Sequence, residues 1–159
     1  MLKKVVLSNQ MLIAIKDSKI NITSEKVTRE LAKKFTKFLK GGEFVFLYGE
    51  MGVGKTTFVK YFVNEYQRKN NLLQTEITSP TFSLLNEYQV KDIRIKHYDL
   101  FRINKREDVK SLDIFEKDNK LITLIEWPQL LTDKQNIKSI DLTFNYLNDL
   151  NDRSVDIKV

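Results

Sequence analysis

A glycine-rich turn between two apolar segments constrains the fold of this 159-residue chain more than any other feature. Residues 44–48 read Phe-Val-Phe-Leu-Tyr, a run of apolar and aromatic side chains typical of a buried strand. Residues 58–63 repeat apolar side chains at the spacing of one helix face. Between them, Gly49 to Thr56 matches the phosphate-binding spacing G-x-x-x-x-G-K-[ST]. The sequence therefore predicts a strand, a phosphate-binding turn and a helix in succession.

The residue types in this turn suit a polyphosphate. Backbone N–H groups can surround phosphate oxygens only where no Cβ blocks the approach, and glycine meets that condition. Lys55 can bring a positive charge to the β- and γ-phosphates, and the hydroxyl of Thr56 can ligate magnesium. The residues predicted to contact the nucleotide here are Gly49, Glu50, Met51, Gly52, Val53, Gly54, Lys55, Thr56 and Thr57. The alternative is a plain glycine-rich turn with a surface lysine, and the strand–turn–helix context favours phosphate binding.

The length and composition predict a single domain spanning residues 1–159. The sequence has no cysteine, which excludes disulfides, thiolate zinc sites and thiol catalysis. It has no apolar run long enough to cross a bilayer, and its first residues do not read as a secretory leader, so we expect a cytoplasmic protein without membrane contact. The net charge of +6 is compatible with an acidic partner such as RNA, although a lysine-rich surface is the plainer explanation.

The pattern along the chain predicts the α/β class: a single P-loop NTPase domain with a mixed central sheet, helices on both faces and antiparallel hairpin strands. Within residues 5–22, apolar runs at 5–7 and 11–15 suit one or two edge strands, in an N-terminal extension (1–22) whose packing the sequence leaves open. Before the phosphate loop, the pattern predicts a helix from Thr23 or Ser24 to Gly41-Gly42. After the helix that follows the loop, it predicts a loop at 77–82, a hairpin of 83–90 and 93–98, and a polar connector or lid at 100–120 with short helical segments at 106–115. The last predicted elements are a buried strand at 121–125 and a closing hairpin of 137–146 and 153–159.

Two carboxylates follow predicted strands and are candidates for the chemistry beside the phosphate loop. Magnesium at such a loop normally takes a carboxylate from the C-terminal end of a neighbouring strand. Glu126 follows the buried strand at 121–125 and is the favoured metal-side carboxylate. Asp99 is then free to orient or deprotonate the attacking water or to hold a magnesium-bound water, and capping of the next segment is its structural alternative.

Two further residues in these motifs read as structural rather than chemical. His97, the only histidine, is expected to be a half-buried strand residue rather than a catalytic base. Trp127 is either a core anchor or a partner contact, and the core is favoured.

Separated motifs occur together in one order along the chain. They are Gly-Glu-Met-Gly-Val-Gly-Lys-Thr-Thr at 49–57, Ser-Pro-Thr-Phe at 79–82 with Asn-Glu-Tyr at 86–88, His-Tyr-Asp-Leu-Phe-Arg at 97–102 and Ile-Glu-Trp-Pro at 125–128. Together they resemble the TsaE family, small bacterial ATPases of tRNA threonylcarbamoyladenosine biosynthesis. The likeness spans most of residues 23–144.

The resemblance implies roles for particular residues. Lys55 and Thr56 would handle phosphate and magnesium, and Glu126 would ligate magnesium. Asp99 would be needed for ATP hydrolysis, and Thr81 would lie in a loop that senses the nucleotide state. The implied cofactors are ATP/ADP and Mg²⁺. The implied partners are TsaD-like and TsaB-like proteins, which the ATPase binds and restores for further turnovers, with tRNA reached indirectly through that complex.

The chain departs from the family pattern at three places. Glu50-Met51 replaces the usual Asp-Leu, and Val53 replaces alanine; these side chains can point away from the phosphates. A glycine common in the family is replaced near Asp113.

Two other functions compete with this one. A small-molecule P-loop kinase shares the phosphate loop but needs a lid with arginines, for which only Arg102 and Arg106 are well placed. A basic RNA-binding module with incidental nucleotide would instead show a steep salt dependence of RNA affinity.

Overall fold

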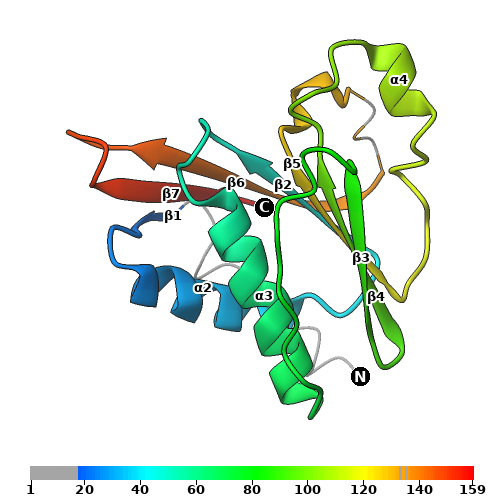
Figure 1. Ribbon diagram of the computed structural model, residues 1–159, viewed down its shortest axis with the longest axis horizontal. Coiled ribbons are helices and arrows are strands. Elements are labelled where there is room, and N and C mark those ends of the chain that lie inside the picture. Colours follow the sequence, from blue (N-terminus) through cyan, green and yellow to red (C-terminus); the bar gives the residue numbers. More distant parts are fainter. Residues whose placement is uncertain (1–17, 133, 135) are drawn as a thin grey trace.

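The computed structural model describes residues 18–132, 134 and 136–159, and this part of the chain forms a seven-stranded mixed sheet (Figure 1). The strand order is β1-β7-β6-β2-β5-β4-β3. The strands are β1 (Ser18–Asn21), β2 (Glu43–Tyr48), β3 (Leu85–Val90), β4 (Ile93–Asp99), β5 (Leu121–Glu126), β6 (Lys138–Tyr146) and β7 (Arg153–Lys158). The helices are α2 (Glu25–Phe38), α3 (Lys55–Lys69), α4 (Arg106–Lys110) and the short 3₁₀ helix η1 (Pro128–Leu130).

The centre of the sheet is parallel and its margins are antiparallel. β2 pairs in parallel with both β5 and β6, and β5 pairs in parallel with β4. The predicted hairpins form the margins, since β3 pairs antiparallel with β4 and β6 pairs antiparallel with β7. Because the central strands run in the same direction, the carboxyl ends of β2, β5 and β4 lie together at one edge of the sheet. Ligand-binding crevices in open α/β sheets form at this edge.

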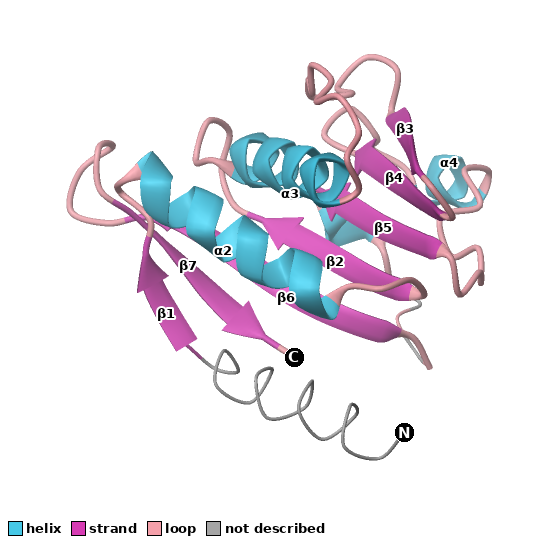
Figure 2. Cartoon of the chain, turned by 90° about the horizontal axis from the view of Figure 1, so that it is seen from below, coloured by secondary structure: helices cyan, strands magenta, loops and turns pink. Residues whose placement is uncertain are grey.

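Helices α2 and α3 lie side by side on one face of the sheet (Figure 2). The strands supply alternate apolar side chains to this face, including Val45 and Leu47 of β2. Aromatic rings from both helices fill the space, and the rings of Phe35 and Phe58 meet edge to face with centroids 5.4 Å apart. Most of the apolar side chains at helical spacing in α2 and α3 belong to this core, whereas Val27 of α2 is exposed.

The opposite face is covered by α4, η1 and their connecting segments, so helices lie on both faces as predicted. The segment at residues 100–120 was expected to be a polar connector or lid rather than core, with short helical segments at 106–115. Helix α4 lies within the predicted helical range. Contrary to the expectation, however, Leu100, Val109 and Ile114 are buried against the sheet. They stand in a segment rich in charged and polar residues, a composition that favours the surface. Asp113 has the left-handed φ of 46° that glycine adopts most readily.

Strand β1 forms one edge of the sheet and pairs antiparallel with β7. The apolar runs at residues 5–7 and 11–15, on which the predicted edge strands depend, lie outside the described residues. None of the described helices is long and apolar enough to span a membrane.

Candidate functional site

The phosphate loop connects β2 to α3 in the conformation that its glycines require. A Cβ at Gly49 would lie 2.6 Å from the carbonyl oxygen of Phe144, so this position excludes every larger residue. Gly54 precedes α3 with a φ of 116°, and a Cβ there would meet nothing within 4 Å. Backbone geometry rather than packing therefore requires glycine at Gly54, and the space beside the helix N-terminus is open to a ligand. The positive end of the helix dipole faces this space.

Lys55 is held at the loop by backbone carbonyls and by an aromatic ring. Its Nζ donates to the carbonyl oxygens of Gly49 and Glu50, at 2.8 Å in each case, and lies 4.2 Å from the centroid of the Trp127 ring. Burial lowers the pKa of Lys55 below that of a free lysine, and the charges of Glu126 and Asp99 oppose this shift. The amine therefore lies in a partly desolvated position, where its attraction for phosphate is stronger than in water.

Glu126 ends β5 and contacts the helix that follows the phosphate loop. Thr56 Oγ1 donates a hydrogen bond to Glu126 Oε1 at 2.8 Å, across 70 residues of sequence. The parallel pairing of β2 with β5, with Leu47 opposite Glu126, sets this contact. A carboxylate and a hydroxyl at this separation can share one magnesium ion or its bound water.

A magnesium ion at this site would need further ligands. Among the residues that the structure describes, no group of three or more His, Cys, Asp or Glu side chains could hold a metal ion. Magnesium is commonly bound through one or two protein oxygens together with substrate phosphates and waters. The donor set of Thr56 and Glu126 therefore fits a metal that binds together with a nucleotide.

Asp99 ends β4 directly beside Glu126, to which it is paired in the sheet register. Its Oδ2 accepts hydrogen bonds from Ser79 Oγ at 2.6 Å and from Thr81 Oγ1 at 2.8 Å. Its Oδ1 accepts the backbone N–H of Phe101 at 3.0 Å. Asp99 Oδ1 therefore makes the capping contact expected as the alternative to a chemical role, while Oδ2 is held by the hydroxyls of Ser79 and Thr81.

These groups converge on one cavity of about 260 Å³. Its walls are Met51, Gly52, Gly54, Lys55, Thr56, Thr57, Ser79, Thr81, Asp99, Phe101, Glu126 and Trp127. Three loop residues that the sequence assigned to the nucleotide lie outside this wall. Val53 is fully buried in the core, while Gly49 and Glu50 direct carbonyl oxygens to Lys55.

Sequence reasoning missed Ser79 and Phe101 as residues of the cavity wall. Ser79 lies two residues before Thr81 in the same motif, and that spacing was the available signal. Trp127 was favoured as a core residue, but it is only partly buried, at the margin of the second core cluster. Trp127 has a left-handed φ of 57°, and the centroid of its ring lies 4.9 Å from the centroid of the Phe101 ring. The turn that follows β5 therefore places the indole in the cavity wall.

His97 also differs from the expectation of a half-buried strand residue. Its side chain is completely buried, and Nε2 lies 2.8 Å from Glu126 Oε1. The pairing of β4 with β5 brings the two side chains together, which residue spacing alone does not reveal.

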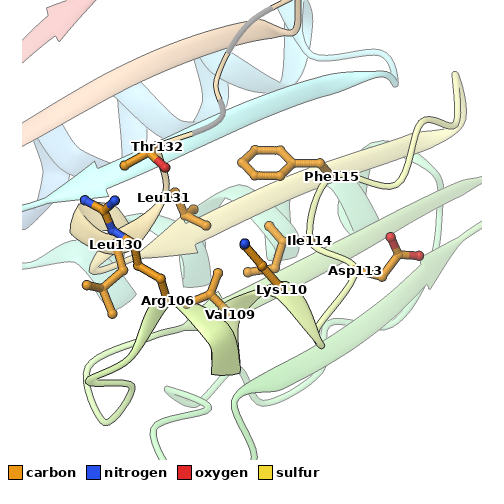
Figure 3. A pocket seen from close by; sticks show the side chains of 9 residues that line it. All are labelled: Arg106, Val109, Lys110, Asp113, Ile114, Phe115, Leu130, Leu131 and Thr132. Atoms are coloured by element: carbon orange, nitrogen blue, oxygen red, sulfur yellow. The ribbon is translucent and has the colours of Figure 1, made fainter.

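A second hollow, of about 220 Å³, lies on the opposite face between α4 and η1 (Figure 3). Apolar side chains such as Val109 and Ile114 line it, and Arg106 and Lys110 project at its margin. Arg106 therefore lies away from the phosphate-loop cavity, where a kinase would need it.

The strand–loop–helix unit, the mixed sheet and the carboxylate beside the loop define a P-loop domain. A family model described as "Threonylcarbamoyl adenosine biosynthesis protein TsaE" matches residues 22–155. The chain belongs to the TsaE family, whose role lies in tRNA threonylcarbamoyladenosine biosynthesis.

Individual relatives agree with this assignment. The chain is 38% identical over 110 residues to a "tRNA threonylcarbamoyladenosine biosynthesis protein TsaE" of Rickettsia typhi, covering 69% of this chain and 74% of that protein. A protein of the same description from Rickettsia bellii is 34% identical over 137 residues, covering 84% and 90% of the two chains. The crystal structure of Bacillus subtilis YdiB superposes with a TM-score of 0.63 at 21% identity, covering 88% of this chain and 83% of that one, and so shares its fold.

Proposed function

We propose that this protein binds ATP with Mg²⁺, hydrolyses it to ADP and phosphate, and uses the hydrolysis to reset a TsaD- and TsaB-type transferase complex in the cytoplasm. The contact of Thr56 Oγ1 with Glu126 Oε1 carries the catalytic part of this proposal. It joins the phosphate-loop helix to a strand-end carboxylate at the edge where nucleotides bind in α/β sheets. Family membership supports the pathway and the partners.

Each polar group in the cavity has a distinct role in this reaction. The loop N–H groups and Lys55 hold the phosphates, and Thr56 with Glu126 hold the magnesium ion, which neutralises charge on the β- and γ-oxygens when bound. Asp99, with Oδ2 already oriented by Ser79 and Thr81, directs or deprotonates the attacking water. Positioning and electrostatic stabilisation supply most of the rate in phosphoryl transfer, and rigid strand ends are suited to both.

The arrangement of the arginines disfavours the small-molecule kinase. Arg102 lies over the exposed ring of Phe82, at 4.8 Å from its centroid, and Arg106 lines the separate hollow near α4. Within the described residues, therefore, neither candidate arginine lines the cavity that would have to shield an acceptor from water.

The decisive experiment is tRNA modification by the purified partner pair, with and without this protein, under multiple-turnover conditions with ATP and magnesium. We expect the wild-type protein to raise the yield beyond one product per complex. Asp99→Asn, which should bind ATP without hydrolysing it, is the matched control and should leave the yield near one turnover. An unchanged yield with the wild-type protein would refute the resetting role, while ATP hydrolysis measured in parallel would test the catalytic part by itself.

A further inference from the structure

A completely buried histidine, His97, contacts Glu126, the carboxylate proposed to hold magnesium. His97 lies on β4, and its Nε2 is 2.8 Å from Glu126 Oε1. The same oxygen accepts the hydroxyl of Thr56, also at 2.8 Å. Within the described residues, therefore, Glu126 Oε1 contacts both Thr56 of the phosphate-loop helix and His97 of the neighbouring strand.

The surroundings of the imidazole determine which ring nitrogen carries the proton. His97 Nδ1 is buried, and none of the residues that the structure describes offers it a hydrogen-bond partner. If the proton were on Nδ1, a buried N–H would lack an acceptor, and orphaned N–H donors are rarer and more costly than under-satisfied acceptors. An ionised carboxylate, in turn, can only accept. The tautomer that gives the ring N–H an acceptor is therefore the one whose Nε2–H donates to Glu126 Oε1.

We infer that His97 is a positioning residue, whose Nε2–H fixes the Glu126 carboxylate in the orientation that holds magnesium. This inference rests on the proposed metal role of Glu126. A free glutamate side chain samples several rotamers, whereas a carboxylate held through Oε1 by a strand and a helix is restricted to one. Hydrogen bonds to metal-binding groups act in this way generally, and their removal typically lowers metal affinity by about 10- to 100-fold.

The first test uses the fact that this chain has a single histidine, so an imidazole signal needs no assignment by mutation. Histidine-selective ¹⁵N labelling and NMR of the wild-type protein should show a protonated Nε2 and an unprotonated Nδ1. A ring protonated on Nδ1 alone would overturn the inference, because Nε2 could not then donate to Glu126. This measurement requires neither metal nor a variant that folds.

The second test compares His97→Gln, whose side-chain amide can reach about as far as Nε2, with His97→Asn, which is too short. The readout is the ratio of dissociation constants for a non-hydrolysable ATP analogue in EDTA and in excess magnesium. We expect His97→Gln to keep the wild-type ratio and His97→Asn to lower it by about 10- to 100-fold. Ile95→Val, a buried change two residues earlier on β4, is the matched control and should keep the ratio while lowering the unfolding temperature.

The outcomes separate this inference from the proposed function. If magnesium tightens nucleotide binding equally in the wild type and in both His97 variants, His97 has no positioning role and the metal site stands. Equal losses in His97→Gln and His97→Asn would also overturn the inference, because reach would not matter. If magnesium has no effect on the wild type, the proposed metal role of Glu126 is refuted together with the inference.

Discussion

The two strand-end carboxylates occupy equivalent places in the sheet but have different partners. Asp99 and Glu126 are paired across β4 and β5, and both are buried. Glu126 is joined to Thr56 in the first turn of α3. Asp99 is joined to Ser79 and Thr81, in a loop whose neighbouring residue Phe82 is 86% exposed. One carboxylate is thus attached to a packed helix and the other to an exposed loop.

This difference explains how two acidic residues at one edge can take two roles. A metal site requires donors held in a fixed geometry, which a helix packed on a sheet provides. A group that acts on water can instead be coupled to a loop, whose position is free to respond to the nucleotide. The partner of each carboxylate, rather than its place at the end of a strand, therefore distinguishes the proposed metal side from the proposed water side.

The largest effect should come from Asp99→Asn, which keeps the shape of the side chain but removes its charge and basicity. We expect kcat for ATP hydrolysis to fall by about 10²- to 10⁴-fold, the usual contribution of a general base. ATP affinity, measured by titration calorimetry, should remain close to that of the wild type. An unchanged kcat would show that Asp99 does not act on the attacking water, and the two carboxylates would no longer have distinct roles.

Glu126→Gln should give the complementary result in binding. Without the negative charge, the tightening of ATP binding by magnesium should fall by about 10- to 100-fold, while affinity in EDTA stays the same or rises. Lys55→Ala is the control, because it removes a phosphate contact and should weaken binding with and without magnesium. Magnesium titrations of Glu126→Gln that superimpose on those of the wild type would remove this residue from the metal site.

A smaller effect is expected from Thr81→Val, which removes one hydroxyl from Asp99 with little change in volume. The loss of one such hydrogen bond amounts to about 0.5–1.5 kcal/mol, or roughly 2- to 10-fold in kcat. The dependence on magnesium should not change, because Thr81 contacts the other carboxylate. Thr78→Val, on the same exposed loop, serves as the control, and an equal loss in that variant would point to a general disturbance of the loop.

The smallest signal should be optical. Trp127 is the only tryptophan, and the Lys55 amine lies 4.2 Å from the centroid of its ring. Phosphate that draws the amine from the ring should change the indole emission when ATP is titrated. The same change should occur in Asp99→Asn and disappear in Lys55→Ala. A flat titration of the wild-type protein would show that Lys55 does not leave the ring.

Local patterns were sufficient to predict the elements around the site. The run before Gly49 and the helical spacing after Lys55 identified β2 and α3, because each signal lies within a few consecutive residues. The buried run ending at Glu126 identified β5 in the same way. The contribution of residues 100–120 to the core was not predicted, because Leu100, Val109 and Ile114 stand in a segment rich in charged side chains and only the folded sheet gathers them.

The sequence alone determined the phosphate loop and its glycines, since the backbone conformation of a short turn depends on the residues within it. Only the tertiary structure decided which groups face Glu126 and Asp99. The contacts of His97 and Thr56 with Glu126 depend on the register between strands, and a slip of one residue would turn every side chain of a strand to the other face. That register is set by packing over the whole sheet, so no short stretch of sequence carries it.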